Sequence, residues 1–509
     1  MHRRDFLRYG AIAALAPVSD SVPVGRRVRP PGELWDLTAV SATTALREGD
    51  ISAEAYASAL LARCERFVAF NAFISLDRVR VLENARRADL HRRSGAALGP
   101  LHGLPLPVKD SINTAELPTS SGTAALRDFR PTVNAPVLQA LVSAGAIVLG
   151  KTNLHELSLG VTSNNSTFGP CRNPYDASRI SGGSSGGSAV AVALRMAPLA
   201  VGEDTTCSIR VPAALCGIAG LRPTTGRYPQ AGVMPISPRF DSVGAMARSV
   251  EDLLLFDSVQ RPGAPVAPPR ELRAVRFGAP PAYWESLDPE VERVAQEALY
   301  RLRADGAEVV SVDVPEVVKS DLATVIDILS YEVTTNEANF LRNQAAGVSF
   351  EQMLTKMSAA LRSRFEREFI AGGVDSVPES RYRVALRQLE VICEAMRQHF
   401  RDNELTALVF PPTLTPALPI GVEGAVTIGS SESTVRTAML RNTVHASCVG
   451  MPGLVLPAGL TRGGLPVGIE FDMLPGDDRA LLSMGLRLER AIGSIAPPRD
   501  ARFAAMPAN

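Results

Sequence analysis

Apolar and polar positions alternate along this chain with two different periods, and stretches of each kind follow one another. An apolar residue at every third or fourth position predicts an amphipathic helix, whereas a short continuous apolar run predicts a buried strand. Helices are expected at residues 52–66, 77–93, 137–144, 189–196, 381–400 and 478–492. Strands are expected at residues 68–76, 104–108, 146–149, 199–201, 275–277, 309–314, 407–410, 453–456 and 467–471.

This succession of helices and strands predicts an α/β fold in which a large mixed β-sheet is sandwiched between helices. No internal repeat and no Pro- or Ser-rich linker divides the chain. The sequence therefore predicts a single domain over residues 31–509. Residues 265–430 contain long helical patterns and few glycine motifs, so we expect them to form a variable region that covers the substrate.

The composition excludes several classes of protein. The 53 basic and 53 acidic residues balance, so no basic face is implied and a nucleic-acid partner is not expected. No apolar run reaches the roughly 18–20 residues that span a bilayer. The cysteines are scattered without a Cys-x-x-Cys pair, so neither a metal site nor a disulfide framework is indicated. They are Cys64, Cys171, Cys207, Cys216, Cys393 and Cys448.

Residues 1–30 have the pattern of an export signal rather than of a folded segment. Arg3-Arg4 is followed by Phe6-Leu7 and a short, weakly apolar run at residues 9–18. Paired arginines before such a run resemble a twin-arginine signal, which carries folded proteins out of the cytoplasm. We therefore expect a periplasmic or otherwise exported protein, with a cytoplasmic one as the alternative.

Lysine is rare in this chain, since only four of the 53 basic residues are lysine: Lys109, Lys151, Lys319 and Lys356. A buried lysine can lose its proton and act as a base, whereas arginine stays charged. Lys109 and Lys151 each follow a predicted buried strand, which places them at strand ends. The retained lysines are therefore candidates for chemistry.

Two general motifs offer alternative functions. Residues 145–152 match the P-loop pattern of nucleotide-binding proteins, but the four positions between the glycines form an apolar run typical of a strand. Residues 183–187 match the nucleophile elbow with Ser185 as nucleophile, and His399 or His445 would then complete a Ser-His-Asp hydrolase. No apolar strand leads directly into this elbow. A flexible linker is a third interpretation of the glycine-serine tract at 181–188, although apolar segments flank it.

A fourth interpretation combines Ser184 and Ser208 with Lys109. Glycines around Ser184 allow backbone conformations that are closed to other residues. Ser208 precedes a predicted short helix at residues 209–216, and N–H groups at such a position favour negative charge. Two hydroxyls beside a buried amine can cleave an amide without histidine, metal or cofactor, so no cofactor or metal is expected.

The segments around these residues resemble the amidase signature family. The resemblance covers roughly residues 35–495 and is weak between 265 and 430. It implies an amidase-signature fold and hydrolysis of a carboxamide to a carboxylic acid and ammonia or an amine. The matching segments are residues 182–187, 202, 204, 208–210, 212–213, 216–217 and 220–224, with 108–110 and 150–153 upstream and 464–468 downstream.

The resemblance also implies roles for individual residues. Ser208 is the acyl-accepting nucleophile, Ser184 relays protons after a cis peptide bond, and Lys109 is the base. The other implied residues act through backbone N–H groups or by support. The oxyanion hole is formed by Thr205, Thr206, Cys207 and Ser208, and the site is supported by Ser185, Asp204 and Arg210. The expected partner is a small amide substrate, and a homodimer is the expected assembly.

The chain departs from the family pattern just before Ser208. Thr206-Cys207 stands where two small residues are usual, and Glu203-Asp204 lacks the usual threonine. Backbone N–H groups are unaffected by side chains, so we expect an altered substrate range or rate, with a catalytically silent protein as the alternative. Residues 220–228 and 232–237 are most similar to indoleacetamide and mandelamide hydrolases, which implies arylalkyl amides as substrates.

Overall fold

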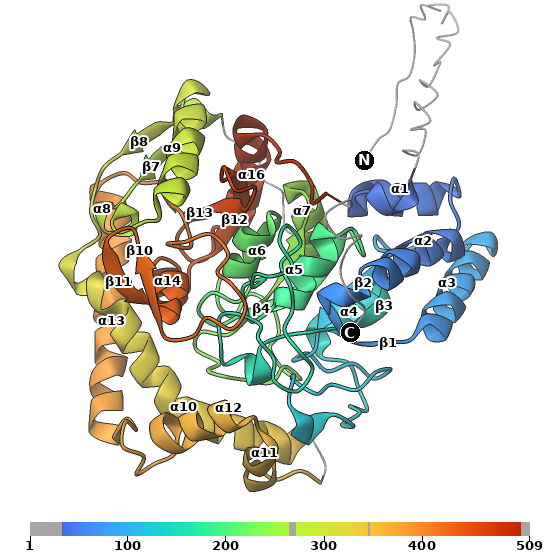
Figure 1. The fold of residues 1–509 in the computed structure, drawn as a ribbon. Helices are drawn as coiled ribbons and strands as arrows, with labels where there is room; N and C mark the ends of the chain where they lie inside the picture. Colours follow the sequence, from blue (N-terminus) through green and yellow to red (C-terminus); the bar gives the residue numbers. More distant parts are fainter. Residues whose placement is uncertain (1–32, 264–270, 345–346, 500–509) are drawn as a thin grey trace, which may run out of the picture.

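The computed structural model describes residues 33–263, 271–344 and 347–499. They form a mixed sheet of eleven strands in the order β1-β3-β2-β4-β6-β5-β12-β13-β9-β7-β8, with helices on both faces (Figure 1). The predicted α/β fold class is confirmed. The strands of this sheet are β1 (Phe73–Leu76), β2 (Pro105–Lys109), β3 (Ile147–Thr152), β4 (Leu199–Asp204), β5 (Ala219–Arg222), β6 (Ser242–Ala247), β7 (Arg276–Gly278), β8 (Glu308–Val310), β9 (Ala407–Phe410), β12 (Gly453–Leu460) and β13 (Pro466–Asp472). A separate hairpin pairs β10 (Ala425–Ile428) with β11 (Ser431–Thr434).

The helices of the described chain vary from short turns to long rods. They are α1 (Ala39–Glu48), α2 (Ala53–Arg66), α3 (Arg78–Arg93), α4 (Pro136–Ser143), α5 (Gly186–Ala193), α6 (Arg210–Cys216), α7 (Val250–Gln260), α8 (Pro281–Trp284), α9 (Pro289–Ala304), α10 (Asp321–Gln344), α11 (Phe350–Lys356), α12 (Ala359–Arg364), α13 (Glu379–Asp402), α14 (Val435–Leu440), α15 (Val444–Val449) and α16 (Asp478–Ile492). None of these helices is both long and apolar enough to cross a membrane.

The parallel strands β2 and β4 bring distant parts of the chain to one edge. They are hydrogen-bonded neighbours, with Val108 opposite Val201, and every residue of both strands is buried. Burial on both faces explains their continuous apolar runs. Because parallel strands end at the same edge of a sheet, Lys109 at the end of β2 lies beside the last residues of β4.

Two layers of helices cover the sheet, and glycines show how closely they pack. A Cβ atom at Gly468 on β13 would lie 2.6 Å from the Ala214 side chain on α6, and 3.2 Å from Val455 on β12. Successive residues of a strand point to opposite faces. Leu454 therefore faces the other side, where Gly485 of α16 approaches it. Helix α6 thus packs on the face opposite to α16.

Most predicted elements are present, with shifted ends. The helix predicted at 478–492 is α16 with the same bounds, and the one at 52–66 is α2, capped by the Ser52 side chain. The strand predicted at 68–76 is wrong in its first half. Asn71 adopts a left-handed conformation and its amide donates to the carbonyl of Phe168, so a 3-10 turn precedes β1.

Residues 265–430 add both strands and helices to this framework. β7, β8 and β9 extend the large sheet at one edge, and α10 and α13 pack against each other (Figure 1). The strand predicted at 309–314 ends at Val310, because β7, the one strand paired with it among the described residues, ends at Gly278 opposite it. The division of the chain into one domain remains a prediction, and the export signal predicted at 1–30 lies outside the described residues.

Candidate active site

The glycine-serine tract at 181–188 is a buried turn that leads into α5. Gly182 has a φ of 78°, a left-handed conformation in which a side chain is strained. A Cβ atom at Gly187 would lie 2.4 Å from the carbonyl oxygen of Ala72, so only glycine fits there. All residues from 181 to 188 are buried. The interpretation of this tract as a flexible linker is therefore wrong.

Lys109 and Ser184 meet at the end of β2. The fully buried Nζ of Lys109 donates to Ser184 Oγ at 2.7 Å, and the peptide bond between Gly183 and Ser184 is cis. Nζ also donates to Oε2 of Glu203 at 2.8 Å and to the carbonyl of Glu203 at 3.2 Å. An ammonium has three donors, so each finds an oxygen in this pocket.

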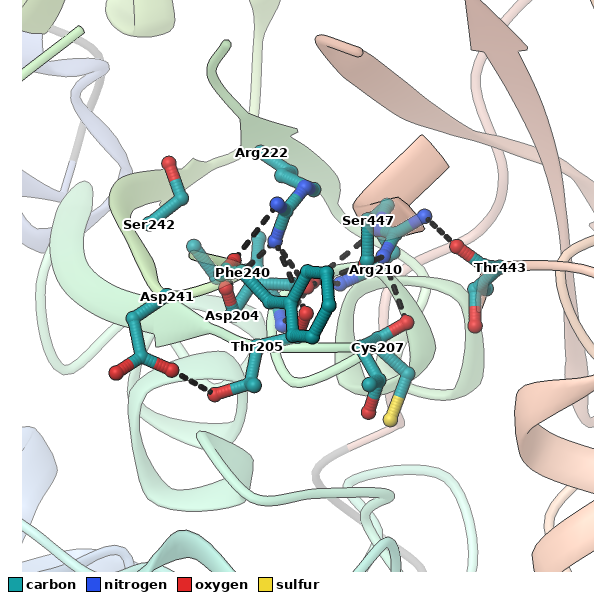
Figure 2. A network of polar contacts seen from close by, with 12 residues as sticks. Asp204, Thr205, Cys207, Arg210, Arg222, Phe240, Asp241, Ser242, Thr443 and Ser447 are labelled. Carbon is teal, nitrogen blue, oxygen red and sulfur yellow. Dashed lines mark hydrogen bonds and ion pairs between the residues drawn. The ribbon is translucent and has the colours of Figure 1, made fainter. Parts of the chain in front are cut away.

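Asp204, the last residue of β4, lies between two buried guanidinium groups (Figure 2). Arg210 binds it with two nitrogens, Nε to Oδ2 and Nη2 to Oδ1, each at 3.1 Å, and Arg222 Nη1 reaches Oδ1 at 3.0 Å. Burial opposes a charged carboxylate, but the two arginines outweigh it and hold the pKa of Asp204 well below its usual range. Asp204 is therefore a permanent anion inside the protein.

The same two arginines also hold the backbone that follows Asp204. Arg222 Nη1 donates to the carbonyl of Asp204 at 2.6 Å and to that of Thr205 at 3.4 Å. Arg210 Nη2 donates to the carbonyl of Thr206 at 2.7 Å. Three consecutive carbonyl oxygens are thus turned toward the arginines.

A trans peptide group directs its N–H opposite to its C=O. The N–H groups of residues 205–207 therefore point away from the arginines. In the described part of the chain, no protein atom accepts a hydrogen bond from the N–H groups of residues 205–208. All four residues line the same cavity. The segment therefore presents unused N–H donors to that cavity.

Ser208 follows this segment and also lines the cavity, with 4% of its surface exposed. Its carbonyl accepts a hydrogen bond from the Ser185 N–H at 3.1 Å, which ties the two serine-bearing segments together. The Ser185 hydroxyl is engaged elsewhere, because it donates to the carbonyl of Glu203 at 2.9 Å. The structure thus brings Lys109, Ser184 and the segment ending at Ser208 to one place.

The cavity has a volume of about 510 Å³, within the range of small-molecule sites. Much of its wall is apolar and comes from several parts of the chain: Leu159, Ile236, Ile326, Leu329, Leu361 and Val435. Ile326 and Leu329 belong to α10 and Leu361 to α12, so residues 265–430 form part of the wall.

Charged side chains also line this cavity. Arg364 and Arg436 are both among its lining residues. Burial, together with the neighbouring charge of Arg364, lowers the pKa of Arg436 to about 10. The wall is therefore apolar over much of its area and positively charged at these two arginines.

Cys207 is a buried structural thiol rather than a nucleophile. Its Sγ donates to the carbonyl of Gly183 at 3.5 Å. Burial raises its pKa to about 12, so the thiol stays protonated at neutral pH. The side chain therefore fills space between the Gly183 turn and the segment before Ser208.

The P-loop alternative is excluded by the structure. Residues 147–152 form the buried strand β3, so they do not form a loop around a phosphate. The Nζ of Lys151 donates to the carbonyl of Ile112 at 2.6 Å and to Thr119 Oγ1 at 2.7 Å, and it lies 3.4 Å from Asp110 Oδ1. This lysine therefore holds the neighbouring chain in place.

The two candidate histidines are not placed to form a Ser-His-Asp site with Ser185. His445 lies 2.8 Å from Asp472 and stacks on Tyr283, and burial lowers its pKa to about 3. His399, on α13, is hydrogen-bonded to Asn403, the residue that follows this helix. Among the described residues, neither histidine is a hydrogen-bond partner of the Ser185 hydroxyl.

Three buried groups at this site were not identified from the sequence. Arg222 was seen only as part of a matching segment, and Glu203 only as a departure from a pattern. Asp241, before β6, was not singled out, although its carboxyl lies 2.7 Å from the Thr205 hydroxyl. The sequence did offer one signal for such groups, since Glu203 and Asp204 are two successive acidic residues at the end of an apolar strand. Within the described ranges, no three His, Cys, Asp or Glu side chains are grouped to hold a metal ion.

Comparison with known proteins identifies the class to which this fold and site belong. The amidase family pattern matches residues 55–482. Mandelamide hydrolase of Pseudomonas putida is 36% identical over 477 residues, which cover 91% of this chain and 93% of that protein. Indoleacetamide hydrolase of Allorhizobium ampelinum is 34% identical, with 90% of this chain and 98% of that protein covered.

Solved structures agree with the sequence comparison. A crystal structure of an amidase matches with a TM-score of 0.81 and 32% identity, over 90% of this chain and all of that one. The peptide amidase of Stenotrophomonas maltophilia matches with a TM-score of 0.77 and 28% identity, over 91% of this chain and 98% of that one. The chain belongs to the amidase family. It is an amidase, a hydrolase that acts on amide bonds.

Proposed function

We propose that this amidase cleaves a carboxamide through an acyl-enzyme on Ser208, with Ser184 and Lys109 as the proton relay. The observation that carries the proposal is the 2.7 Å hydrogen bond between Lys109 Nζ and Ser184 Oγ, beside the cavity that Ser208 lines. Ser208 Oγ attacks the carbonyl carbon and gives its proton to Ser184, which passes its own proton toward Lys109. The relay then runs backward to protonate the leaving nitrogen.

The negative charge that develops on the substrate oxygen is stabilised by the backbone. The N–H groups of residues 205–208 are the proposed donors, because their carbonyls are held on the other side by Arg210 and Arg222. One such donor typically contributes about 3–4 kcal/mol to stabilisation of the transition state. Arg210, Asp204 and Ser185 therefore support the reaction through the backbone and do not contact the substrate.

The proposed substrates are arylalkyl amides. Two of the most similar relatives are named for mandelamide and indoleacetamide, and much of the cavity wall is apolar. Water is the second substrate, and the products are a carboxylic acid and ammonia or an amine. The proposal includes no metal or cofactor.

The test is ammonia release from purified protein with mandelamide, phenylacetamide, indoleacetamide and aliphatic amides of similar length. We expect the aryl amides to have the higher kcat/KM. Ser208→Ala should lower kcat by at least about 10⁴-fold, as removal of a nucleophile does elsewhere, without changing the unfolding midpoint. Amide hydrolysis that survives Ser208→Ala would overturn the mechanism. A wild-type protein inactive on every amide would favour the catalytically silent alternative.

We further propose export through the twin-arginine route, which rests on Arg3-Arg4 and the apolar run after them. Cell fractionation of the full chain in a bacterial host should find it in the periplasm. Arg3-Arg4 changed to Lys-Lys should leave the protein in the cytoplasm, and an unchanged distribution would contradict the proposal.

A further inference from the structure

Glu203 is a buried acidic residue that the mechanism above does not use. Its side chain is 1% exposed, and its Oε2 accepts from Lys109 Nζ at 2.8 Å and from Ser158 Oγ at 3.3 Å. Its Oε1 lies 2.9 Å from the hydroxyl of Thr205. A carboxyl group therefore sits directly behind the amine that receives the relay proton.

A second carboxyl group reaches the same hydroxyl. Thr205 Oγ1 lies 2.7 Å from Asp241 Oδ1 as well as 2.9 Å from Glu203 Oε1. A hydroxyl has one proton, so it donates to one of the two carboxyl groups and must accept from the other. One of the two carboxyl groups is therefore protonated.

The surroundings identify Asp241 as the protonated partner. Burial, and then the charge of Glu203, raise the pKa of Asp241 to about 8. Its other oxygen, Oδ2, accepts from the N–H of Ile236 at 3.0 Å. Asp241 then donates to Thr205, and Thr205 donates to Glu203. Glu203 is left as the carboxylate, paired with a lysine.

We propose that Glu203 is the positioning residue that takes up the relay proton through Lys109, so that Lys109 works from its charged form. This inference rests on the proposed function of Ser208, Ser184 and Lys109. In a mechanism with lysine alone as the base, Lys109 must be neutral in the resting enzyme. A lysine paired with a carboxylate at 2.8 Å does not have to be neutral.

The proton transfers balance without any further reactant. As the Ser208 Oγ–acyl carbon bond forms, the Ser208 O–H bond breaks and its proton moves to Ser184. One Nζ–H bond of Lys109 breaks as an O–H bond forms on Glu203, and the lone pair that this leaves on Nζ accepts the former Ser184 proton. The lysine remains an ammonium, and the carboxylate becomes a carboxylic acid. Collapse of the intermediate returns the proton to the leaving nitrogen by the same path.

The other charged groups nearby are already paired with different partners. On the turn that carries Ser158, Glu156 accepts from the N–H of Ser358. Asp110, the residue after Lys109, faces Lys151 of β3. Asp204, the residue after Glu203, faces Arg210 and Arg222. Lys109 and Asp241 are therefore the titratable groups that act on Glu203.

The experiment follows the reactivity of Ser208 itself, so it does not need the natural substrate. The full-length protein is treated with a fluorescent alkyl fluorophosphonate between pH 5 and 10, and the labelled residue is identified by mass spectrometry. Wild type, Glu203→Gln, Glu203→Asp and Thr205→Val are compared. Glu379→Gln, on the exposed face of α13, is the matched control for loss of a carboxylate.

We expect wild type to label at its full rate near pH 7. Glu203→Gln should label at least about tenfold more slowly there and recover as the pH rises, since no carboxylate remains to take up the relay proton. The pH at which the labelling rate of this variant reaches half of its maximum, on the acidic side of the profile, should be at least one pH unit higher than in wild type. Glu203→Asp should be intermediate, Thr205→Val should show a smaller upward shift, and Glu379→Gln should match wild type.

Two results would overturn the inference. The first is a labelling rate of Glu203→Gln that depends on pH in the same way as that of wild type, including a rate that is lower by the same factor at every pH. The second needs no variant: a wild-type rate that rises tenfold per pH unit up to pH 9 would mean that the lysine must be neutral. Absence of labelling at Ser208 in wild type, by contrast, would contradict the proposed function itself.

Discussion

The adjacent residues Glu203 and Asp204 end the same strand but enter opposite kinds of electrostatic environment. Asp204 lies between two arginines, one of which also pairs with Glu470, whereas Glu203 is paired with one lysine and shares the Thr205 hydroxyl with a second carboxyl group, Asp241. The guanidinium groups of the first cluster also donate to the backbone carbonyls of residues 204–206. The second has more acidic groups than cations and must therefore hold a proton.

The comparison shows that burial alone does not determine what a charged group does. Both carboxyl groups are almost completely buried. Arginine cannot give up its proton, so the Asp204 cluster is a fixed scaffold. Lysine can give up its proton, so the groups around Glu203 are able to transfer protons. Substitutions in the Asp204 cluster should therefore lower stability, and substitutions in the Glu203 cluster should change the pH dependence of activity and stability.

The largest effect is expected for Asp204→Asn. This variant removes the carboxylate shared by Arg210 and Arg222 and leaves Arg222 as a buried cation with no other ion-pair partner in the described part of the chain. Breaking a buried pair in this way typically costs about 3–5 kcal/mol of unfolding free energy. Urea unfolding followed by circular dichroism measures this cost.

An exposed pair provides the control for Asp204→Asn. Glu379 and Arg383 form a salt bridge on α13 with both side chains more than half exposed. Glu379→Gln should change the unfolding free energy by no more than about 0.5 kcal/mol. If Asp204→Asn costs as little as this control, the scaffold role of the Asp204 cluster is wrong.

A pH-dependent effect is expected for Asp241→Asn. The raised pKa of about 8 means that folded Asp241 keeps a proton that the unfolded chain has released above roughly pH 4. The contribution of Asp241 to the wild-type free energy of unfolding therefore falls as pH rises from about 4 to 8, by at most about 1.4 kcal/mol per pH unit. The variant lacks this contribution.

Urea unfolding of both proteins at pH 5 and pH 8 tests this sign. Asp241→Asn should gain stability relative to wild type as the pH rises. Equal slopes in the two proteins would show that Asp241 is not the group that holds the proton, and the comparison between the two clusters would lose its basis.

The smallest effect is expected for Cys207→Ala, which lies on the segment between the two clusters. The substitution removes one weak S–H···O hydrogen bond to Gly183 and keeps the backbone N–H. We expect kcat/KM within about fivefold of wild type, a change of about 1 kcal/mol. In the wild type, a pKa of about 12 predicts no alkylation of Cys207 by iodoacetamide at pH 8. Rapid alkylation or a large loss of activity would give the thiol a role of its own.

Much of the fold followed from periodicity, with errors where local packing decided. The segments 407–410 and 478–492 have the predicted bounds, because continuous apolar runs and amphipathic periods are strong signals. The strands β5 and β6 were not predicted. Their sequences, Ala219–Arg222 and Ser242–Ala247, are rich in alanine and glycine, which have no strong strand preference. They form strands because neighbours on both sides complete their hydrogen bonds.

Some residues of the candidate site could also be predicted from the sequence, and others could not. Lys109 was found because lysine is rare and follows an apolar strand, and Ser184 and Ser208 because glycines and a short helix mark them. Asp241 could not be found, because its role depends on a contact with Thr205, 36 positions away in the sequence. Sequence patterns carry no information on which distant carboxyl group shares a hydroxyl.

The amino-acid sequence by itself determined the α/β class, the membership of the amidase family and the residues from which a Ser-Ser-Lys relay can be built. These follow from patterns that are local along the chain. Only the tertiary structure decided that Lys109 is paired with Glu203, that Asp241 lies behind it, and that arginines hold the carbonyls of residues 204–206. The reason is physical: the charge of a buried group depends on which others surround it, and folding alone brings them together.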